Sequence, residues 1–281
     1  MRIIDIVVNL WTPEVTRQYT PKLDEFWRRV KILELTKQGI PLEEQIRRMD
    51  AAGIEKGLLI ATTGGKPGSD EFFEKPYTVI QDVIERHPDR FKGVIGVNAH
   101  RIMPWLEKLG RAVREFHFVG AHLYPHWHGV PPDDRIFYPF YAKCAELGIP
   151  IEIQVGHSAQ SFLPTVARPM TLDRVAIDFP ELKIIGIHIG YPWTEEMISL
   201  AWKHPNVFIG TDAHAPRYWD RSLVHFINTR GQDKVLFGTD WPVVDFERAI
   251  QEIDALELKE SAKKKLLFEN AVRVFNLEGW V

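Results

Sequence analysis

Apolar segments rich in β-branched residues alternate with segments of helical periodicity along the whole sequence. Eight such apolar segments occur, at residues 2–9, 56–61, 92–98, 118–124, 150–155, 183–188, 206–211 and 234–240. Strands that alternate with helices form parallel sheets, because each helix returns the chain to the same edge of the sheet. Eight such units in a chain of about 250 residues or more predict an α/β fold, a (β/α)8 barrel, with residues 1–281 as a single domain.

The segments between the predicted strands carry signals for the ends of helices. In the segment PLEEQIRRMDAAG, Pro41 lies in the first turn of a predicted helix and Gly53 lies at its end. The predicted helix in FYPFYAKCAELG ends at Gly148. Proline suits the first turn of a helix, and glycine suits the position just after the last one. The amphipathic residues 259–277 predict a terminal helix that packs on the barrel.

The segment that follows the first predicted strand is longer than a usual connection between a strand and a helix. It runs over residues 11–40 and contains Trp11, Phe26 and Trp27. Long connections in compact domains commonly cover binding sites. We therefore expect a lid-like insertion over the mouth of the barrel.

Composition favours small-molecule chemistry over polymer binding. The net charge is −3, so the chain lacks the basic field that recruits nucleic acid or an anionic membrane surface. The sequence has no apolar run long enough for a membrane span and no signal-peptide pattern at its start. With Cys144 as the single cysteine, no intrachain disulfide can form. We predict a cytoplasmic protein that binds neither nucleic acid nor membranes.

Polar side chains gather at the carboxyl ends of the predicted strands. In a barrel these ends meet at one face, so their residues share a pocket. The candidates for this pocket are Asn9, Arg101, Tyr124, His126, Gln154, His157, His188, Asp212, His214, Arg217 and Asp240. Asp5 is expected to fix the backbone at the barrel rim, and Gly64-Gly65-Lys66 lacks the spacing of a nucleotide-binding loop.

The segments IIGIHIGYPW around His188 and VLFGTDWP around Asp240 resemble the amidohydrolase superfamily. The resemblance extends over essentially the whole chain and is to the branch of aminocarboxymuconate-semialdehyde decarboxylase-like and 2-pyrone-4,6-dicarboxylate lactonase-like enzymes. It implies that His188 and Asp240 occupy the positions of the strand-6 histidine and strand-8 aspartate. Val7, Asn9 and Gln154 stand where that pattern has metal-binding histidines. Barrels of this branch often pair, and aromatic residues near WRRVKILEL and LEGWV indicate a homo-oligomer.

The replaced histidines predict a degenerate metal site and no cofactor. Valine has no lone pair, and amide oxygens bind zinc poorly compared with imidazole and carboxylate groups. The alternative is a weakly bound divalent ion held by His188, Asp240 and a neighbour such as His157 or Asn9.

Three functions fit these residues. The first is a metal-independent hydrolase of a lactone, ester or amide of a small cyclic or unsaturated carboxylic acid, with Asp240 as general base. In that reading His188 stabilises the developing charge, and His157 is a second acid or base. The second is a nonoxidative decarboxylase of an aromatic or enoic acid. The third is a noncatalytic protein that binds a small acid.

The remaining candidates are expected to bind a small carboxylate substrate. Arg101 and Arg217 follow predicted strands and would clamp the carboxylate. Tyr124 and His126 lie in the aromatic segment AHLYPHWHG and would stack on a flat acid. Asn9, Gln154, Asp212 and His214 would supply further polar contacts.

Overall fold

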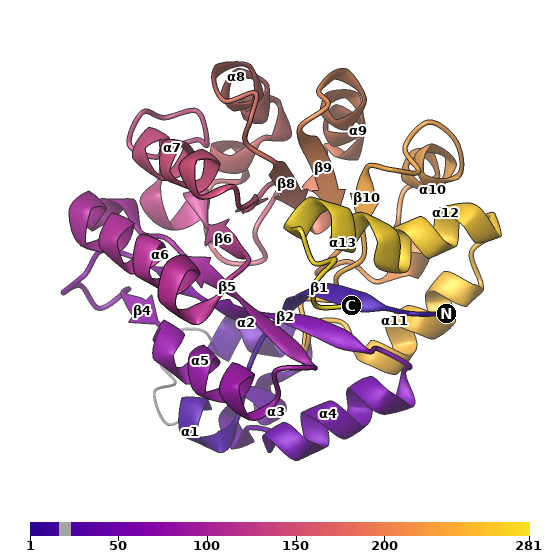
Figure 1. The fold of residues 1–281 in the computed structure, drawn as a ribbon, viewed down its shortest axis with the longest axis horizontal. Helices are drawn as coiled ribbons and strands as arrows, with labels where there is room; N and C mark the ends of the chain where they lie inside the picture. Colours follow the sequence, from indigo (N-terminus) through magenta and orange to yellow (C-terminus); the bar gives the residue numbers. More distant parts are fainter. Residues whose placement is uncertain (17–23) are drawn as a thin grey trace.

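The computed structural model describes residues 1–16 and 24–281 and has the predicted (β/α)8 architecture. Eight strands form one sheet in the order β1-β2-β5-β6-β7-β8-β9-β10, and each neighbouring pair with a recorded register is parallel. The strands are β1 (Ile4–Val8), β2 (Lys56–Ala61), β5 (Phe91–Gly96), β6 (Gly120–Leu123), β7 (Ile151–Gln154), β8 (Ile184–Ile187), β9 (Val207–Gly210) and β10 (Val235–Leu236). Figure 1 shows them at the centre, with helices around them.

Hydrogen bonds between β1 and the chain around β10 close the sheet into a barrel. The Ile6 N–H donates to the Phe237 carbonyl at 3.1 Å, and the Asp240 N–H donates to the Val7 carbonyl at 3.0 Å. Val8 also pairs with Trp241 in a parallel bridge. Closure places the end of the first strand beside Asp240, although the two segments are more than 200 residues apart in sequence.

Each of the eight predicted strands is present, and the largest difference in length is at the last one. The prediction was 234–240, whereas β10 ends at Leu236. Beyond that residue the backbone N–H groups leave the strand ladder: Gly238 donates to the Thr211 hydroxyl and Thr239 donates to the Asp5 carboxylate. Side-chain acceptors thus replace strand pairing where the chain enters the barrel mouth.

Helices on the outside of the barrel cover the strands. They are α4 (Leu42–Ala51), α5 (Tyr77–Arg86), α6 (Ile102–Phe116), α7 (Tyr138–Leu147), α8 (Leu172–Asp178), α9 (Thr194–Lys203), α10 (Arg221–Asn228) and α11 (Phe246–Asp254). The chain ends in α12 (Glu260–Lys264), a π-helical turn (Lys265–Glu269) and α13 (Asn270–Phe275). Val274 and Phe275 of α13 belong to one buried apolar cluster with strand residues such as Ile60 and Ile187. Across the described ranges, no helix is long and apolar enough to cross a membrane.

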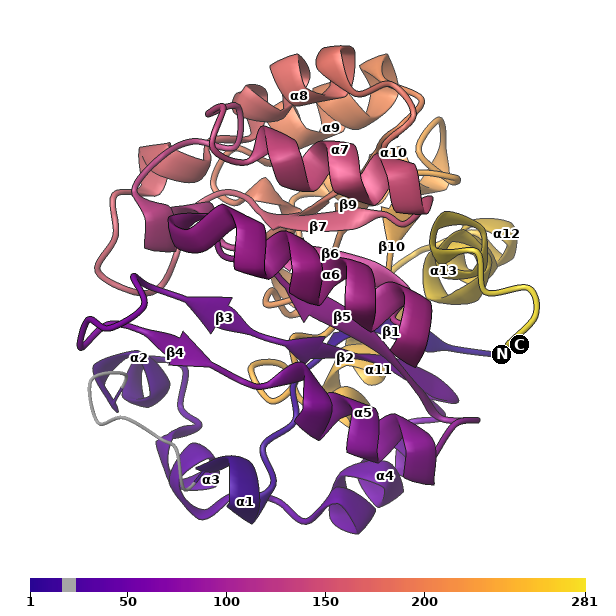
Figure 2. The same cartoon turned by 60° about the vertical axis from the view of Figure 1, so that its left-hand side comes forward.

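The described parts of the insertion after β1 lie at the barrel mouth. They form α1 (Pro13–Thr16), α2 (Asp24–Arg29) and α3 (Leu33–Gln38), and the rest of the predicted lid, residues 17–23, lies outside the described residues. A short antiparallel hairpin of β3 (Thr63–Gly64) and β4 (Phe73–Glu74), which was not predicted, lies at the same end. Figure 2 shows α2 and this hairpin at the end opposite the two chain termini.

Asp5 fixes the backbone where the barrel closes. The register between β1 and β2 shifts between Asp5 and Val8, and the Asp5 carboxylate accepts the N–H of Val7 at 3.1 Å. The same carboxylate accepts the N–H of Thr239 at 3.1 Å and its hydroxyl at 2.5 Å. In turn the Thr239 hydroxyl oxygen accepts the N–H of Trp241 at 3.0 Å. This chain of bonds holds the segment that carries Asp240.

Replacing Asp5 by alanine is expected to lower the free energy of unfolding by about 2 kcal/mol or more, because buried N–H groups lose their acceptor. Urea unfolding followed by circular dichroism measures this change. Asp5→Asn retains one acceptor oxygen and is expected to lose less. Wild-type stability in Asp5→Ala would contradict the assigned role.

Candidate active site

A cavity of about 200 Å³ opens at the carboxyl ends of the strands. Its wall combines residues that follow several barrel strands with residues of the lid and the hairpin. The described residues that line it are Asn9, Trp11, Phe26, Trp27, Val30, Thr62, Phe73, Lys75, Tyr124, Trp127, Gln154, His157, Ser158, Ala159, Gln160, His188, Ala213, His214, Asp240, Pro242 and Val243. This is the size of a site for a small molecule rather than for a polymer.

Aromatic side chains form one side of the cavity. Trp11 and Trp27 of the insertion pack edge to face with ring centroids 5.1 Å apart. Phe73 of the hairpin packs on Trp127 in the same way at 4.9 Å. Rings fixed in this manner offer flat apolar surfaces, which suit a planar ligand. The lid-like insertion therefore contributes directly to the cavity wall.

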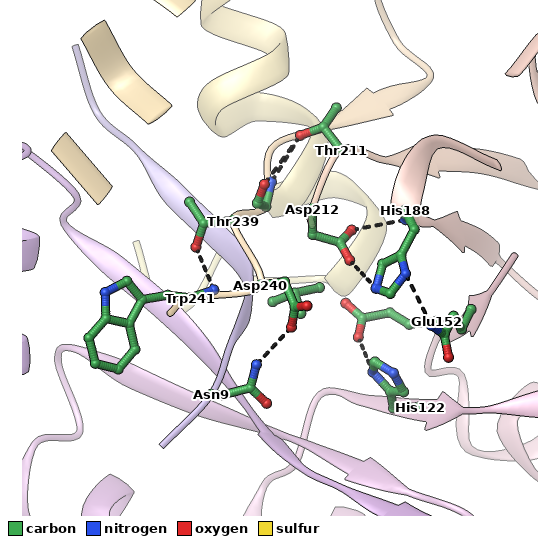
Figure 3. Close-up of polar contacts among 12 residues, drawn as sticks. Asn9, His122, Glu152, His188, Thr211, Asp212, Thr239, Asp240 and Trp241 are labelled. Carbon is green, nitrogen blue, oxygen red and sulfur yellow. Dashed lines mark hydrogen bonds and ion pairs between the residues drawn. The ribbon is translucent and has the colours of Figure 1, made fainter. Parts of the chain in front are cut away.

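Asp240 lines the same cavity. Its Oδ1 atom accepts a hydrogen bond from the Asn9 Nδ2 at 2.7 Å, as Figure 3 shows. Burial raises the pKa of Asp240 to about 7, and the negative charge of Asp212 acts in the same direction, while His188, Asn9 and Lys75 oppose it. A carboxyl group with this pKa can both donate and accept a proton near neutral pH.

The backbone is turned into the left-handed region at the strand ends that border the cavity. Three non-glycine residues that line the cavity have positive φ: His188 at 67°, Ala213 at 64° and Asp240 at 55°. For a residue other than glycine this conformation is unfavourable by about 1 kcal/mol or more, and it occurs preferentially at functional sites. Here it directs the ends of β8, β9 and β10 toward the cavity.

His188 is held between two side chains. Its Nε2 atom lies 3.1 Å from Asp212 Oδ2, and its Nδ1 atom lies 3.2 Å from Gln154 Nε2. Burial opposes the charged imidazole, but the charge and hydrogen bond of Asp212, together with the charge of Asp240, raise the pKa of His188. Asp212 is fully buried, so its carboxylate orients His188 and does not reach the cavity.

A second buried pair lies beside this group (Figure 3). His122 Nδ1 is 3.0 Å from Glu152 Oε2, and both side chains are shielded from solvent. Burial lowers the pKa of His122 to about 3 and raises the pKa of Glu152 well above its usual value. Both shifts have the same cause, because burial disfavours a charge on either side chain of the pair.

Lys75 is a cavity residue that the sequence analysis missed. The residue follows β4, and its N–H donates to the Thr62 carbonyl at 2.7 Å, which fixes the base of the hairpin. The side chain is only 8% exposed, and among the described residues its ammonium has no hydrogen-bond partner. Burial lowers the pKa of Lys75 to about 7, opposed by the charge of Asp240.

The structure brings most of the predicted site residues to the cavity. Tyr124, His157 and His214 line it beside Asn9, Gln154, His188 and Asp240. The His157 and His214 rings both pack on Tyr191, with centroids 5.1 and 5.3 Å away. Burial lowers the pKa of His214 to about 4, so this imidazole is neutral at physiological pH.

His126 and the two arginines are not placed at the cavity. His126 is buried behind the wall, where its Nε2 faces the Gly156 carbonyl at 3.1 Å. Arg101 is exposed on the 3₁₀ turn Ala99–Arg101. Arg217 pairs with Glu252 of α11. The structure thus does not bring either arginine of the predicted clamp to the cavity wall.

Known proteins resemble this chain in sequence. A model of the amidohydrolase family matches residues 42–277. A gamma-resorcylate decarboxylase from Polaromonas sp. is 23% identical over 293 aligned positions, which cover 84% of this chain and 87% of the relative.

Solved structures share the fold along nearly the whole chain. An uncharacterized TIM-barrel protein from Bordetella bronchiseptica aligns with a TM-score of 0.82 and 24% identity, covering 99% of this chain and all of the other. A 5-carboxyvanillate decarboxylase from Novosphingobium aromaticivorans, in complex with manganese and a nitrobenzoic acid, aligns with a TM-score of 0.75 and 20% identity. The alignment covers 98% of this chain and 96% of that one.

The manganese in that structure corrects one prediction. The sequence predicts a chain without a cofactor, because Val7, Asn9 and Gln154 stand in place of histidines. A decarboxylase of the same fold holds a metal ion. This finding points to a metal cofactor and contradicts the expectation of none.

Proposed function

Because the chain belongs to the amidohydrolase family, we propose that it is a nonoxidative decarboxylase of a small aromatic or unsaturated carboxylic acid. The observation that carries the proposal is that Asp240, a carboxyl group with a pKa of about 7, lines the same cavity as the aromatic rings of Trp11, Trp27, Phe73 and Trp127. The decarboxylase names of a relative and of a solved structure support it. They favour this alternative over the hydrolase that was the first expectation.

The 5-carboxyvanillate decarboxylase structure contains manganese, so the residues of this cavity are compared with the ligands that a metal ion needs. At the cavity the strong donors are Asp240 and His188, and both nitrogens of His188 already face protein groups. In the part of the chain that the structure describes, no group of three or more His, Cys, Asp or Glu side chains is placed to hold a metal. These residues do not supply the three or more imidazole, thiolate or carboxylate ligands that usually hold a catalytic metal ion. The proposed reaction therefore uses the side chains alone.

Asp240 supplies the proton in the proposed reaction. The substrate lies against the aromatic wall with its carboxylate-bearing carbon toward Asp240. The carboxyl proton of Asp240 moves to that carbon, the bond to the carboxylate breaks, and carbon dioxide leaves while its bonding electrons return to the ring or double bond. Asp240 is left as a carboxylate and takes a proton from water. The products are one carbon dioxide and the acid skeleton with one new C–H bond.

His188 and Asn9 stabilise the charge that this step leaves on Asp240. The raised pKa of His188 favours the imidazolium form, and its positive charge lowers the pKa of Asp240. The Asn9 amide donates to the same carboxylate. The aromatic wall excludes water from the substrate carboxylate, which favours its conversion to neutral carbon dioxide.

The proposal is tested by measuring carbon dioxide release from planar acids with a hydroxyl group next to the carboxylate. The panel includes 2,6-dihydroxybenzoate and 5-carboxyvanillate, and each assay is run with added manganese and with a chelator. We expect release of one carbon dioxide per acid consumed for at least one member. Matched esters and lactones test the hydrolase. Their turnover, with no carbon dioxide from any acid, would contradict the proposal.

A further inference from the structure

The chain buries the Lys75 amino group at the cavity, where the charge of Asp240 acts on it but no described protein group forms a hydrogen bond with it. Of the described lysines and arginines, Lys75 is the one that lines the cavity, and its Nζ has no hydrogen-bond partner there. The nearest recorded contact is the Trp11 ring, whose centroid is 5.4 Å from Nζ. A buried ammonium without a partner costs several kcal/mol. Proteins keep a buried group that lowers their stability in this way where the group has a role in binding or chemistry.

A structural role does not account for this side chain. The backbone of Lys75 already secures the hairpin through its bond to Thr62, and that bond does not depend on the side chain. The aliphatic part of lysine could be replaced by methionine, which would fill the same space without the charge. The ammonium therefore contributes nothing to the fold that an apolar residue would not supply.

We propose that Lys75 binds a second anionic oxygen group of the substrate, a carboxylate or phenolate that remains in the product. An ammonium in a cavity with apolar walls attracts an anion strongly, because little water competes for either charge. The wall of Trp11, Trp27 and Phe73 beside it suits the flat skeleton that would carry such a group. This inference specifies the substrate class of the proposed decarboxylase and rests on that function for the identity of the group.

The group that Lys75 binds is not the one that leaves. An ion pair with the departing carboxylate would stabilise the substrate more than the transition state, since the charge of that carboxylate disappears as carbon dioxide forms. A contact with a different oxygen is equally strong in substrate and transition state and sets the orientation. Such a contact leaves the departing carboxylate free of Lys75 and its carbon open to the proton of Asp240.

Binding of benzoate and of its neutral analogue benzamide to the resting protein tests the inference without turnover. Quenching of tryptophan fluorescence reports binding, because Trp11, Trp27 and Trp127 line the cavity. We expect wild-type protein to bind benzoate at least about tenfold more tightly than benzamide. Lys75→Met should lose this preference through weaker benzoate binding, and Lys75→Arg should retain part of it. Lys66→Met, which removes an exposed lysine of the loop between β3 and β4, is the matched control.

Stability separates this role from a structural one. Lys75→Met removes a buried charge without a partner, so we expect it to unfold at the same temperature as wild type or higher. For an acid that turns over, the variant should raise KM more than it lowers kcat. An unchanged benzoate preference in Lys75→Met, or no such preference in wild type, would overturn the inference. If Lys75→Met loses the preference for benzoate but wild type releases no carbon dioxide from any acid, the proposed function is rejected and the role of Lys75 in anion binding stands.

Discussion

Replacing Asp240 by asparagine is expected to lower kcat for decarboxylation at least about 100-fold, because asparagine has no acidic proton to give to carbon. The amide has nearly the same shape as the carboxyl group, so binding of the substrate should change less. Carbon dioxide release at saturating substrate measures kcat directly. Asp82→Asn, on the exposed face of α5, makes the same chemical change away from the cavity and should leave kcat unaltered.

The pH dependence of the wild-type rate follows from the same group. Burial raises the pKa of Asp240 to about 7, and the proposed step requires its protonated form. As pH rises through this value the protonated fraction falls, so kcat, measured at saturating substrate, should decrease about tenfold per pH unit on the alkaline side. The residual activity of Asp240→Asn should lack this decrease. A wild-type rate that instead rises with pH through 7 would assign Asp240 as a base and contradict the proposed step.

Replacing Asp212 by asparagine is expected to lower kcat by about 10- to 100-fold, although this side chain does not reach the cavity. Its carboxylate lies 3.1 Å from His188 and raises the pKa of that imidazole. The neutral amide removes this charge, so His188 becomes neutral near pH 7 and no longer stabilises the carboxylate form of Asp240. KM should change little, because Asp212 is a positioning residue.

Nuclear magnetic resonance titration of His188 distinguishes this role from simple loss of structure. In Asp212→Asn the pKa of His188 should fall, and the unfolding temperature should stay close to that of the wild type. Asp82→Asn again serves as the control. If the kcat of Asp212→Asn falls while the titration of His188 is unchanged, the charge of Asp212 does not act through His188.

The barrel could be predicted because its signals are local and repeated. Each strand is a short apolar segment, and Gly53 and Gly148 mark the ends of helices within one turn of the predicted positions. The hairpin of β3 and β4 could not be predicted in this way. Each of its strands has two residues, so neither produces a period that can be recognised.

The site was predictable where it depends on strand ends and not where it depends on long-range pairing. Gln154 ends β7, His188 directly follows β8, and Asp240 lies shortly beyond β10, and all three meet at the cavity. Arg217 also follows a strand, but Glu252, 35 residues later, binds it on the outside. Lys75 reaches the cavity because the hairpin carries it there. No pattern in the surrounding sequence FFEKPY indicates an unpartnered ammonium.

Incubation of the wild-type protein with its acid substrate in deuterium oxide, followed by mass spectrometry of the product and measurement of the released gas, shows whether Asp240 protonates the carbon that loses its carboxylate. We expect one carbon dioxide per molecule consumed and one deuterium on the carbon that carried the carboxylate. Both should be lost together in Asp240→Asn. A product that has gained the elements of water, with all its carboxylate carbon retained, would contradict decarboxylation.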